Sequence, residues 1–299
     1  MKKIFLIMLF AFTYSLFAQN PDFTGYVRNY SGMLVGNSSN DFVIMQNTFN
    51  LNIEKSFTNS AFKVNPMIYH DNSDSLTFRL REAYLDLYLG DFDLRVGKQQ
   101  IVWGKADGVF ITDIVSPKNL FQFLLPEFDE IRIGVEGAKF NYYMGNSTFE
   151  LVWLPVFTPT EYANSNSVWS VTPTFQMTPI FDYSNETVNA SLENSELFLK
   201  YSALTEYIDF ELMGGCMWDD DPTMLSSFVS DGTGGSNLVI SPEYKRLSLA
   251  GGSFSTTLGP FVLRGEGAYV GARPLPERGE LHLEAAAVRD QLQQRAVHP

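Results

Sequence analysis

The most constraining feature of the sequence is the segment REAYLDLYLGDFDLRVGKQQIVWG at residues 81–104, in which two alternating stretches flank a short polar turn. The first stretch puts three leucines on one face and two tyrosines and an aspartate on the other. The turn at 90–93 is short enough to close a β-hairpin. The returning stretch puts Leu94 and Val96 on one face and Arg95 on the opposite face. Because this ribbon has one apolar and one charged face, we expect lipid on the apolar side and water on the charged side.

The N-terminal segment MKKIFLIMLFAFTYSLFAQ has the pattern of a secretory signal peptide, with two lysines before an apolar stretch at 4–17 and a cleavage point after Ala18. The apolar stretch is shorter than the roughly 20 residues of a membrane-spanning helix, so a membrane anchor is the weaker alternative. No later stretch of the sequence approaches such a helix. If the mature chain enters a membrane, we expect a closed barrel, because a barrel pairs every backbone polar group.

Composition excludes several function classes. The net charge of −13 argues against binding to nucleic acid or to an anionic membrane surface. The single cysteine, Cys216, excludes an intrachain disulfide framework and a cysteine-based zinc site. Aromatic residues make up 14% of the chain, which suits the aromatic girdles of a membrane barrel and equally suits the core of a soluble sandwich.

Period-two alternation predicts about eleven strands and therefore an all-β chain. The expected strands are 23–34, 41–54, 61–69, 76–89, 94–104, 131–143, 148–156, 196–203, 207–218, 246–257 and 261–270. The alternation slips phase near Arg81 and Glu82, which predicts a β-bulge, and Gly97 indicates a second bulge. Pro66 is awkward within its strand because it has no N–H to donate to a neighbour.

The connections between these strands form two alternating sets. Short turns are expected at 55–60, 90–93, 144–147, 204–206 and 258–260. Mostly longer loops are expected at 35–40, 70–75, 104–130, 157–194 and 219–242. Outer-membrane barrels have short periplasmic turns and longer external loops. The sequence therefore predicts a transmembrane antiparallel up-and-down β-barrel, with a soluble ligand-binding barrel of exchanged faces as the alternative fold.

The polar face of the predicted barrel supplies the candidate site. Nine charged strand residues are candidates to line a pore: Arg79, Asp86, Arg95, Glu150, Lys200, Asp209, Glu211, Arg264 and Glu266. The loop 104–130 is expected to fold into the pore, with five candidates for a constriction: Asp107, Asp113, Lys118, Glu127 and Asp129. Two alternatives stay open. The charges can pair across strands and simply fill a narrow barrel, and the loop can lie on the surface and pack its own leucines and phenylalanines.

Catalysis and metal binding have weak support. Before Gly271 the mature chain has one histidine, His70, with Asp71 and Ser73 close to it only in sequence, so a Ser-His-Asp site is disfavoured. The acidic run 219–221 could help to hold Ca²⁺ through carboxylate oxygens, but a solvated acidic loop is the favoured interpretation. We therefore expect no enzyme activity, no metal site and no cofactor.

The segment after Gly271 breaks the strand pattern. The predicted organisation is a signal peptide at 1–18, a barrel at 19–271 and an atypical tail at 272–299, with a short helix over 280–294. Eleven strands are an odd number, whereas bacterial single-chain barrels have even numbers. Either the tail is foreign to the barrel, as after a frameshift or a truncated reading frame, or it is a genuine helix. Whether the barrel closes at its C-terminus is left open.

Several short segments resemble a known family. They are LREAYLDL at 80–87, GKQQIVWG at 97–104, ITDIVSPKNL at 111–120 and WLPVFTP at 153–159. Through these segments the region 78–159 resembles uncharacterised porin-like outer-membrane proteins of the domain-of-unknown-function 1302 type. The resemblance implies a barrel in the outer membrane, and it implies no catalytic residues and no defined substrate.

These observations lead to one functional expectation and one alternative. We expect a porin-like channel or transporter for small solutes in the cell outer membrane. The alternative is a structural or surface-interaction barrel whose external loops bind a ligand. The expected partners are outer-membrane lipid, the barrel-assembly machinery and small solutes, with no nucleic acid. The sequence leaves the solute and the oligomeric state open.

Overall fold

The structure is a computed structural model that divides into two compact units, residues 1–100 and 101–299, called here the N-terminal and C-terminal units. It describes residues 21–35, 42–71, 76–104, 111–123, 125–163, 167–170, 175, 177–230, 232 and 234–272. The predicted signal peptide lies outside the described residues, as does the predicted tail beyond Ala272. Each unit is described by itself.

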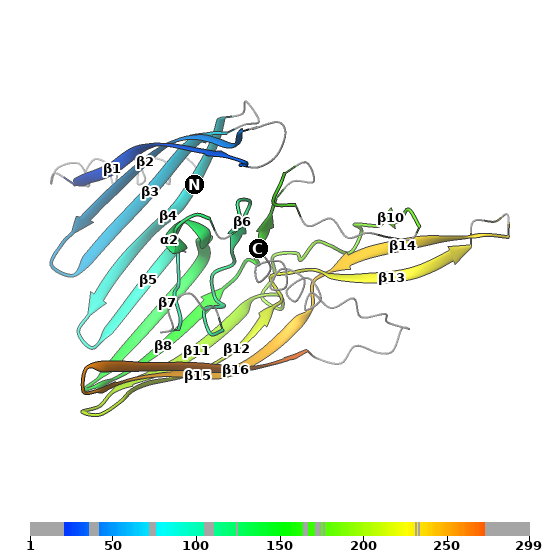
Figure 1. The fold of residues 1–299 in the computed structure, drawn as a ribbon. Coiled ribbons are helices and arrows are strands. Elements are labelled where there is room, and N and C mark those ends of the chain that lie inside the picture. The colour runs from blue at the N-terminus through cyan, green and yellow to red at the C-terminus, as the bar shows by residue number, and fades with distance from the viewer. Residues whose placement is uncertain are drawn as a thin grey trace, which may run out of the picture. The chain divides into compact units, whose positions relative to one another are not determined.

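The N-terminal unit consists of five antiparallel strands in chain order (Figure 1). They are β1 (Asp22–Met33), β2 (Phe42–Ser56), β3 (Ser60–His70), β4 (Leu76–Leu89) and β5 (Phe92–Gln99). The β2–β3 and β4–β5 connections are the short ones, as the sequence predicts. Gly90 adopts a φ of 73° in the two-residue β4–β5 turn, a backbone conformation that favours glycine.

The predicted β-bulge near Arg81 is confirmed. Asn65 on β3 is opposite Glu82 on β4, but the next residue, Pro66, is opposite Leu80, so Arg81 is the extra residue. One extra residue reverses the parity of a strand. Pro66 is accommodated at this irregularity, where proline is tolerated within a sheet.

The second predicted bulge, at Gly97, is absent from the pairing of β5 with β4. The register of β4 and β5 continues without a shift, with Gly97 opposite Tyr84 and Lys98 opposite Ala83. Gly97 instead takes a φ of 131°, and a Cβ there would meet the carbonyl oxygen of Ala83. A glycine can absorb the irregularity in its own backbone, so no extra residue is required.

The C-terminal unit contains six antiparallel strands in chain order. They are β7 (Val135–Met144), β8 (Ser147–Leu154), β11 (Glu196–Leu204), β12 (Asp209–Trp218), β15 (Arg246–Leu258) and β16 (Phe261–Ala272). The connections also contain β6 (Asn119–Leu120), α2 (Phe128–Ile131), β9 (Glu161–Tyr162) and β10 (Ile180–Phe181). The short turns join β7 to β8, β11 to β12 and β15 to β16, and the long connections alternate with them.

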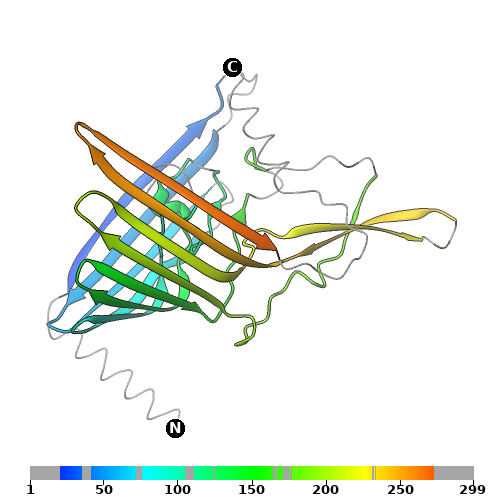
Figure 2. The ribbon, with the colours of Figure 1, turned by 90° about the horizontal axis from the view of Figure 1, so that it is seen from below.

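The predicted loop 219–242 is partly wrong, because it contains a hairpin. The strands β13 (Thr223–Ser230) and β14 (Ser236–Glu243) pair in antiparallel fashion, and Figures 1 and 2 show this hairpin projecting beyond the ends of β12 and β15. Its residues towards the tip are exposed, including Phe228 and Val229. Because both sides of the tip are exposed, the sequence there has no alternation of apolar and polar residues from which a strand could be predicted.

The predicted all-β, up-and-down fold is confirmed. The large sheet holds eleven strands, the number that the sequence predicts. Within the described residues β1 pairs only with β2, and β16 pairs only with β15. Among the described residues, each of these two strands therefore has a strand neighbour on one edge.

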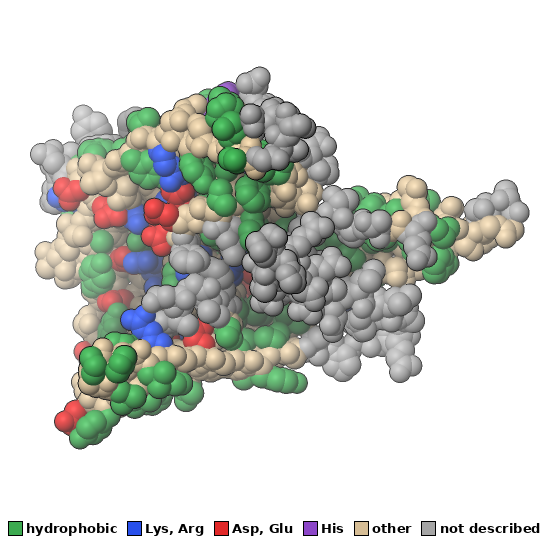
Figure 3. Space-filling view, in the orientation of Figure 1, with side chains coloured by type: hydrophobic (Ala, Val, Ile, Leu, Met, Phe, Trp, Pro, Cys, Tyr) green, Lys and Arg blue, Asp and Glu red, His purple; other side chains and the backbone are tan. Residues whose placement is uncertain are grey.

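The two faces of the strands differ in chemistry. In the N-terminal unit Val27 and Phe78 are 81% and 64% exposed, and in the C-terminal unit Leu212 and Leu199 are 57% and 52% exposed. On the opposite face Asp86 is only 9% exposed, and Figure 3 shows charged side chains of both signs gathered on the face turned to the viewer. Exposed apolar side chains on so many strands far exceed what a water-soluble surface carries, and they suit contact with lipid.

Among the described residues, no helix has the length and hydropathy required to cross a membrane.

Candidate functional site

The polar face of the N-terminal unit holds charges in pairs across strands. Asp86 on β4 and Arg95 on β5 are directly opposite each other in the register. Arg95 Nε and Nη2 donate to the two carboxylate oxygens of Asp86 at 2.7 and 2.9 Å. The guanidinium also lies 3.8 Å from the ring centroid of Tyr84. The structure thus brings two predicted residues together in a bidentate pair, which is the strong and directional form of this contact.

A second group on this face centres on Lys63, which the sequence analysis did not single out. Lys63 Nζ lies 2.8 Å from a carboxylate oxygen of Glu82 and 3.5 Å from one of Glu54. Lys63 occupies β3 between the two strands that carry its partners. Its position between Phe62 and Val64 in an alternating strand was the signal that could have identified it as a polar-face residue.

Arg79 lies on the same face, nearer the loop end of β4. Its Nε donates to the hydroxyl of Tyr69 on β3 at 3.1 Å. The neighbouring strands add two buried amides, since Asn50 and Asn65 exchange side-chain hydrogen bonds of 3.4 and 3.1 Å. This part of the face therefore combines a guanidinium, a phenol and amides, all of which can bind hydroxylated solutes.

In the C-terminal unit the predicted residues Glu150 and Lys200 come together. They are directly opposite on β8 and β11, with 3.6 Å between Lys200 Nζ and a Glu150 carboxylate oxygen. The indole Nε1 of Trp103 donates to the same oxygen, and Lys200 Nζ lies 5.2 Å from the centroid of the Trp103 ring. The pair is thus joined to the segment that follows β5, through a tryptophan that sequence reasoning did not assign to the site.

That segment packs against the strand face that carries Glu150 and Lys200. Trp103 meets Phe198 edge to face at 5.8 Å between ring centroids, and Ile101 N donates to Ser116 Oγ at 2.8 Å. One apolar cluster joins the segment to the strands: Ile101, Trp103, Val115, Val135, Val152, Leu154, Phe198, Met213, Met217 and Leu249. Alternation assigns side chains to a face, but it does not show what covers that face. The described parts of loop 104–130 therefore include residues that lie against the strands.

Asp113 and Lys118 anchor this loop. Asp113 is 2% exposed, and its carboxylate accepts from Trp103 N at 3.2 Å and from Arg132 Nε at 2.8 Å. Lys118 Nζ donates to the carbonyl oxygen of Asp113 at 3.0 Å. A buried carboxylate with a guanidinium partner holds two distant parts of the loop together. Arg132 was missed by sequence reasoning because nothing in its local pattern points to Asp113.

Two further acidic candidates accept hydrogen bonds from hydroxyl groups. Glu266 on β16 accepts from Thr112 N at 3.3 Å and from Thr112 Oγ1 at 2.9 Å. Glu211 on β12 accepts from Ser253 Oγ at 2.9 Å, and these two residues are opposite in the register. Glu266 therefore contacts the loop as well as belonging to a strand.

The other candidates lie on strands, in or beside α2, or outside the described residues. Asp209 on β12 and Arg264 on β16 both lie opposite Ser255 of the strand between them. Glu127 precedes α2 and is exposed, and the Asp129 side chain is 86% exposed with a 3.8 Å contact to Arg132. Asp107 lies outside the described residues.

The connections of the C-terminal unit contain an aspartate whose acidity is strongly altered. Burial raises the pKa of the Asp220 carboxyl well above its usual value, and the nearby charge of Glu196 adds to this shift. Burial also lowers the pKa of Lys118, although the negative charges of Asp113 and Asp220 oppose the change. Thr160 N donates to the Asp220 carbonyl oxygen at 3.1 Å, so this acidic segment ties two connections together.

Neither a catalytic group nor a metal centre emerges from the described residues. His70 is the last residue of β3, and Ser73 lies outside the described residues. Among the described side chains, no group of three or more His, Cys, Asp or Glu is placed to hold a metal ion. Cys216 is an exposed free thiol on β12.

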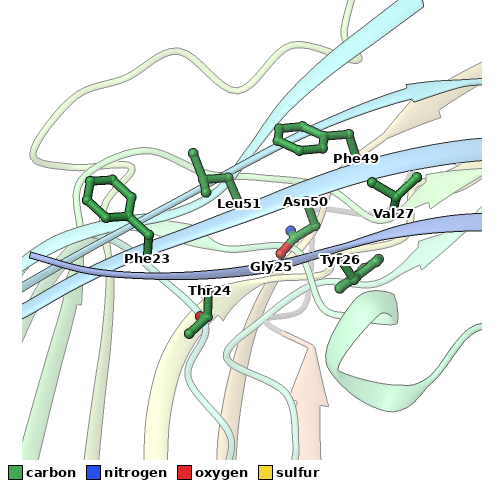
Figure 4. Close-up of a pocket in the computed structure, with 8 residues that line it drawn as sticks. All are labelled: Phe23, Thr24, Gly25, Tyr26, Val27, Phe49, Asn50 and Leu51. Carbon is green, nitrogen blue, oxygen red and sulfur yellow. The ribbon is translucent and has the colours of Figure 1, made fainter.

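An open depression occurs at the ribbon of β1 and β2 (Figure 4). Its lining includes Phe23, Val27, Phe49 and Leu51, which point to one side in Figure 4, whereas Thr24, Tyr26 and Asn50 point to the other. Residues of both faces contribute, so the depression is a gap at a strand edge and not an enclosed ligand pocket. A Cβ on Gly25 would meet the carbonyl oxygen of Asn50, which explains the glycine in this ribbon.

A family model described as Protein of unknown function (DUF1302) matches residues 16–289. The chain belongs to this family. The match covers most of the chain, and it confirms the family predicted from the motifs between residues 78 and 159. It also extends past Gly271, while the boundaries of the predicted signal peptide, barrel and tail stay a prediction.

Solved structures with a similar fold include outer-membrane proteins. OmpT from Vibrio cholerae, as a mutant that lacks loop L8, is 12% identical with a TM-score of 0.43, over 86% of this chain and 72% of that chain. OccK2 from Pseudomonas aeruginosa, solved with glucuronate, is 11% identical with a TM-score of 0.40, over 85% of this chain and 61% of that chain. A mutant porin from Rh. blastica is 12% identical with a TM-score of 0.32, over 84% of each chain. No curated protein matches the chain.

The fold and the strand surfaces agree with the predicted location, the cell outer membrane. The DUF1302 chain is an all-β chain whose strands expose an apolar face in each unit. A sheet of this kind is stable where lipid covers that face.

Proposed function

We propose that this DUF1302 protein is a porin-like channel or transporter that passes small solutes across the outer membrane. The observation that carries the proposal is the chemistry of the face opposite the apolar one, where charged groups lie in pairs. The side chains of Lys63, Arg95, Glu150 and Lys200 keep exposed fractions between 12% and 26%. Charges in such pairs retain contact with water, as a hydrated pathway requires.

The proposed pathway contains charges of both signs, so it favours small polar solutes over apolar ones. Paired residues such as Asp86 and Arg95 can interact with a passing solute while each stays balanced by the other. In the C-terminal unit the segment held by Trp103 and Asp113 occupies part of the strand face. We assign to this segment the predicted constriction, which would limit the size of the solute.

Planar-bilayer recording of the refolded, purified protein tests this proposal. A channel should produce stepwise current increments, in preparations whose folding is verified by heat-modifiable mobility on gels. A preparation that shows the folded mobility but never gives stepwise current would reject the channel.

A second candidate function is a surface-interaction barrel, and the β13–β14 hairpin is the observation that favours it. The hairpin projects from the end of the C-terminal unit that carries the long connections, and it exposes Phe228 at 66% and Val229 at 50%. Exposed apolar side chains on a projecting element are typical of a contact surface for another protein. Replacing residues 225–241 with a short glycine-serine link should leave the conductance of a channel intact, whereas a surface-interaction barrel would give no current with or without the hairpin.

A further inference from the structure

We propose that the polar face of the N-terminal unit carries a binding subsite for small hydroxylated carboxylates, centred on Arg28, Arg79 and the tyrosines against them. The inference deepens the channel proposal and rests on it, because it names the class of solute that this face would select.

The register brings the residues of the subsite into two adjacent rows. In one row Arg28 on β1 is opposite Thr48 on β2, and Thr48 is opposite Tyr69 on β3. In the next row Tyr26 on β1 is opposite Asn50 on β2, and Asn50 is opposite Met67 on β3. Met67 is in turn opposite Arg79 on β4. Residues opposite each other on one face of a sheet lie about 4.5–5.5 Å apart, and diagonal neighbours lie about 7–8 Å apart. The two arginines therefore flank a small area of hydroxyl and amide groups.

Each arginine lies against tyrosine rings. The Arg28 guanidinium lies 5.4 Å from the ring centroid of Tyr26 and 6.0 Å from that of Tyr30. The Arg79 guanidinium lies 5.9 Å from the centroid of Tyr69 and donates to its hydroxyl. Arg28 therefore lies near the faces of two rings, whereas Arg79 gives one N–H to a phenol oxygen. A guanidinium has five N–H donors in a planar fork that matches the geometry of a carboxylate. The tyrosines thus fix the position of both arginines on this face.

Thr48 gives independent evidence for a ligand at this place. Its side chain is 1% exposed, and its Oγ1 has no hydrogen-bond partner among the described residues. A buried hydroxyl without a partner is uncommon in proteins and calls for an explanation such as a bound group. Thr48 lies in the row between Arg28 and Tyr69, so a hydroxyl of a bound solute would supply the missing hydrogen bond.

The position of the subsite separates it from the ion pairs of the same unit. Arg79 is three residues from the loop end of β4, whereas Asp86, the partner of Arg95, is three residues from the turn end. Figure 4 shows Tyr26 and Asn50 pointing away from Phe23 and Phe49, on the opposite side of the ribbon from the apolar side chains. A solute entering from the loop end would therefore meet the arginines before the ion pairs.

Gluconate is the probe for the experiment, with chloride and neutral glucose as references. Single-channel conductance is recorded over a range of potassium gluconate concentrations for the wild type and for Arg28→Gln, Arg79→Gln and Thr48→Val, all with verified folded gel mobility. Lys245→Gln is the matched control, because it removes one positive charge from a connection of the C-terminal unit. The expected result is conductance that saturates with gluconate in the wild type, with about tenfold weaker saturation in each arginine variant. Thr48→Val should weaken gluconate saturation without altering the reversal potential in potassium chloride.

Three results would overturn the inference while leaving the channel intact. They are a linear gluconate response in the wild type, equal saturation in the arginine variants, and an equal loss in Lys245→Gln. If the folded wild type gives no current, the channel proposal fails, and equilibrium dialysis of labelled gluconate against detergent-solubilised protein then tests the subsite alone. Retention of gluconate over glucose that is lost in Arg28→Gln would support the subsite, and equal retention of both would overturn it.

Discussion

Single residues explain how the loop after β5 is held to the strands. Trp103 reaches Glu150 through its indole N–H, and its own backbone N–H donates to Asp113. The sequence identified Glu150 and Asp113 as charged residues of interest, but it could not show that one tryptophan joins them. That link depends on the path of the chain between strands, which no local pattern encodes.

The buried carboxylate of Asp113 is the strongest test of this arrangement. Asp113→Asn removes the buried negative charge that pairs with Arg132, whose side chain is 10% exposed. Breaking a buried ion pair by removing one partner costs about 3–5 kcal/mol. Urea unfolding followed by loss of the folded gel band should show this decrease in the free energy of unfolding. Asp129→Asn is the control, because the Asp129 side chain is 86% exposed, and an equal loss in both variants would contradict the anchoring role.

The raised pKa of Asp220 makes the stability of one connection dependent on pH. Its pKa is above the 3.8 of an unperturbed aspartate, so the folded connection binds the proton more tightly than the unfolded one. The resulting stabilisation is complete below about pH 4 and is lost as the pH rises through the folded pKa. Limited proteolysis within 219–222 should therefore be faster at pH 8 than at pH 5, and Asp220→Asn should abolish the difference. Glu206→Gln, in a turn at the other end of the strands, should keep it; an unchanged pH effect in Asp220→Asn would refute this explanation.

At the scale of elements, most strands of the sheet could be predicted, because lipid on one side and water on the other force a strict alternation. The phase slip at Arg81 was visible for the same reason, since an extra residue moves the leucines to the other parity. Gly97 suggested a bulge, but its pairing with β4 continues without a shift and the glycine takes a positive φ instead. The β13–β14 hairpin was missed because its tip is exposed on both sides. Cross-strand pairs such as Asp86 with Arg95 depend on register, which alternation alone does not define.

Deletion of Arg81 tests the bulge. Without the extra residue, Leu80 and Glu82 become neighbours, so the apolar side chains on both sides of the bulge share one parity and β4 can pair with β3 without an irregularity. We expect deletion of Arg81 to preserve most of the correctly folded protein, measured as the fraction with heat-modifiable gel mobility. Deletion of Phe49, at which β2 pairs with β1 and β3 without a shift, should cause a large loss, because one part of that strand must then present its apolar side chains to the polar face. An equal loss after deletion of Arg81 would show that the bulge itself is required for folding.

At the scale of the whole molecule, the orientation of the apolar face towards lipid governs every other conclusion. Leu199→Arg would place a charge on that face, and an arginine at the middle of a bilayer costs about 2–4 kcal/mol. Leu192→Arg is the matched control, because Leu192 is 80% exposed in the connection before β11. Folding yield into lipid vesicles should fall for the first variant and not for the second. Equal yields would mean that the face of Leu199 is not in contact with lipid.

The projecting hairpin provides an insertion site for determining the membrane topology of the protein in living cells. Gly232, between β13 and β14, has a φ of 76°, and a Cβ built there meets nothing within 4 Å. A short peptide epitope inserted after this glycine therefore has room to extend without disturbing a packed neighbour. Antibody staining of intact, unpermeabilised bacteria would then show directly which end of the strands faces the external medium.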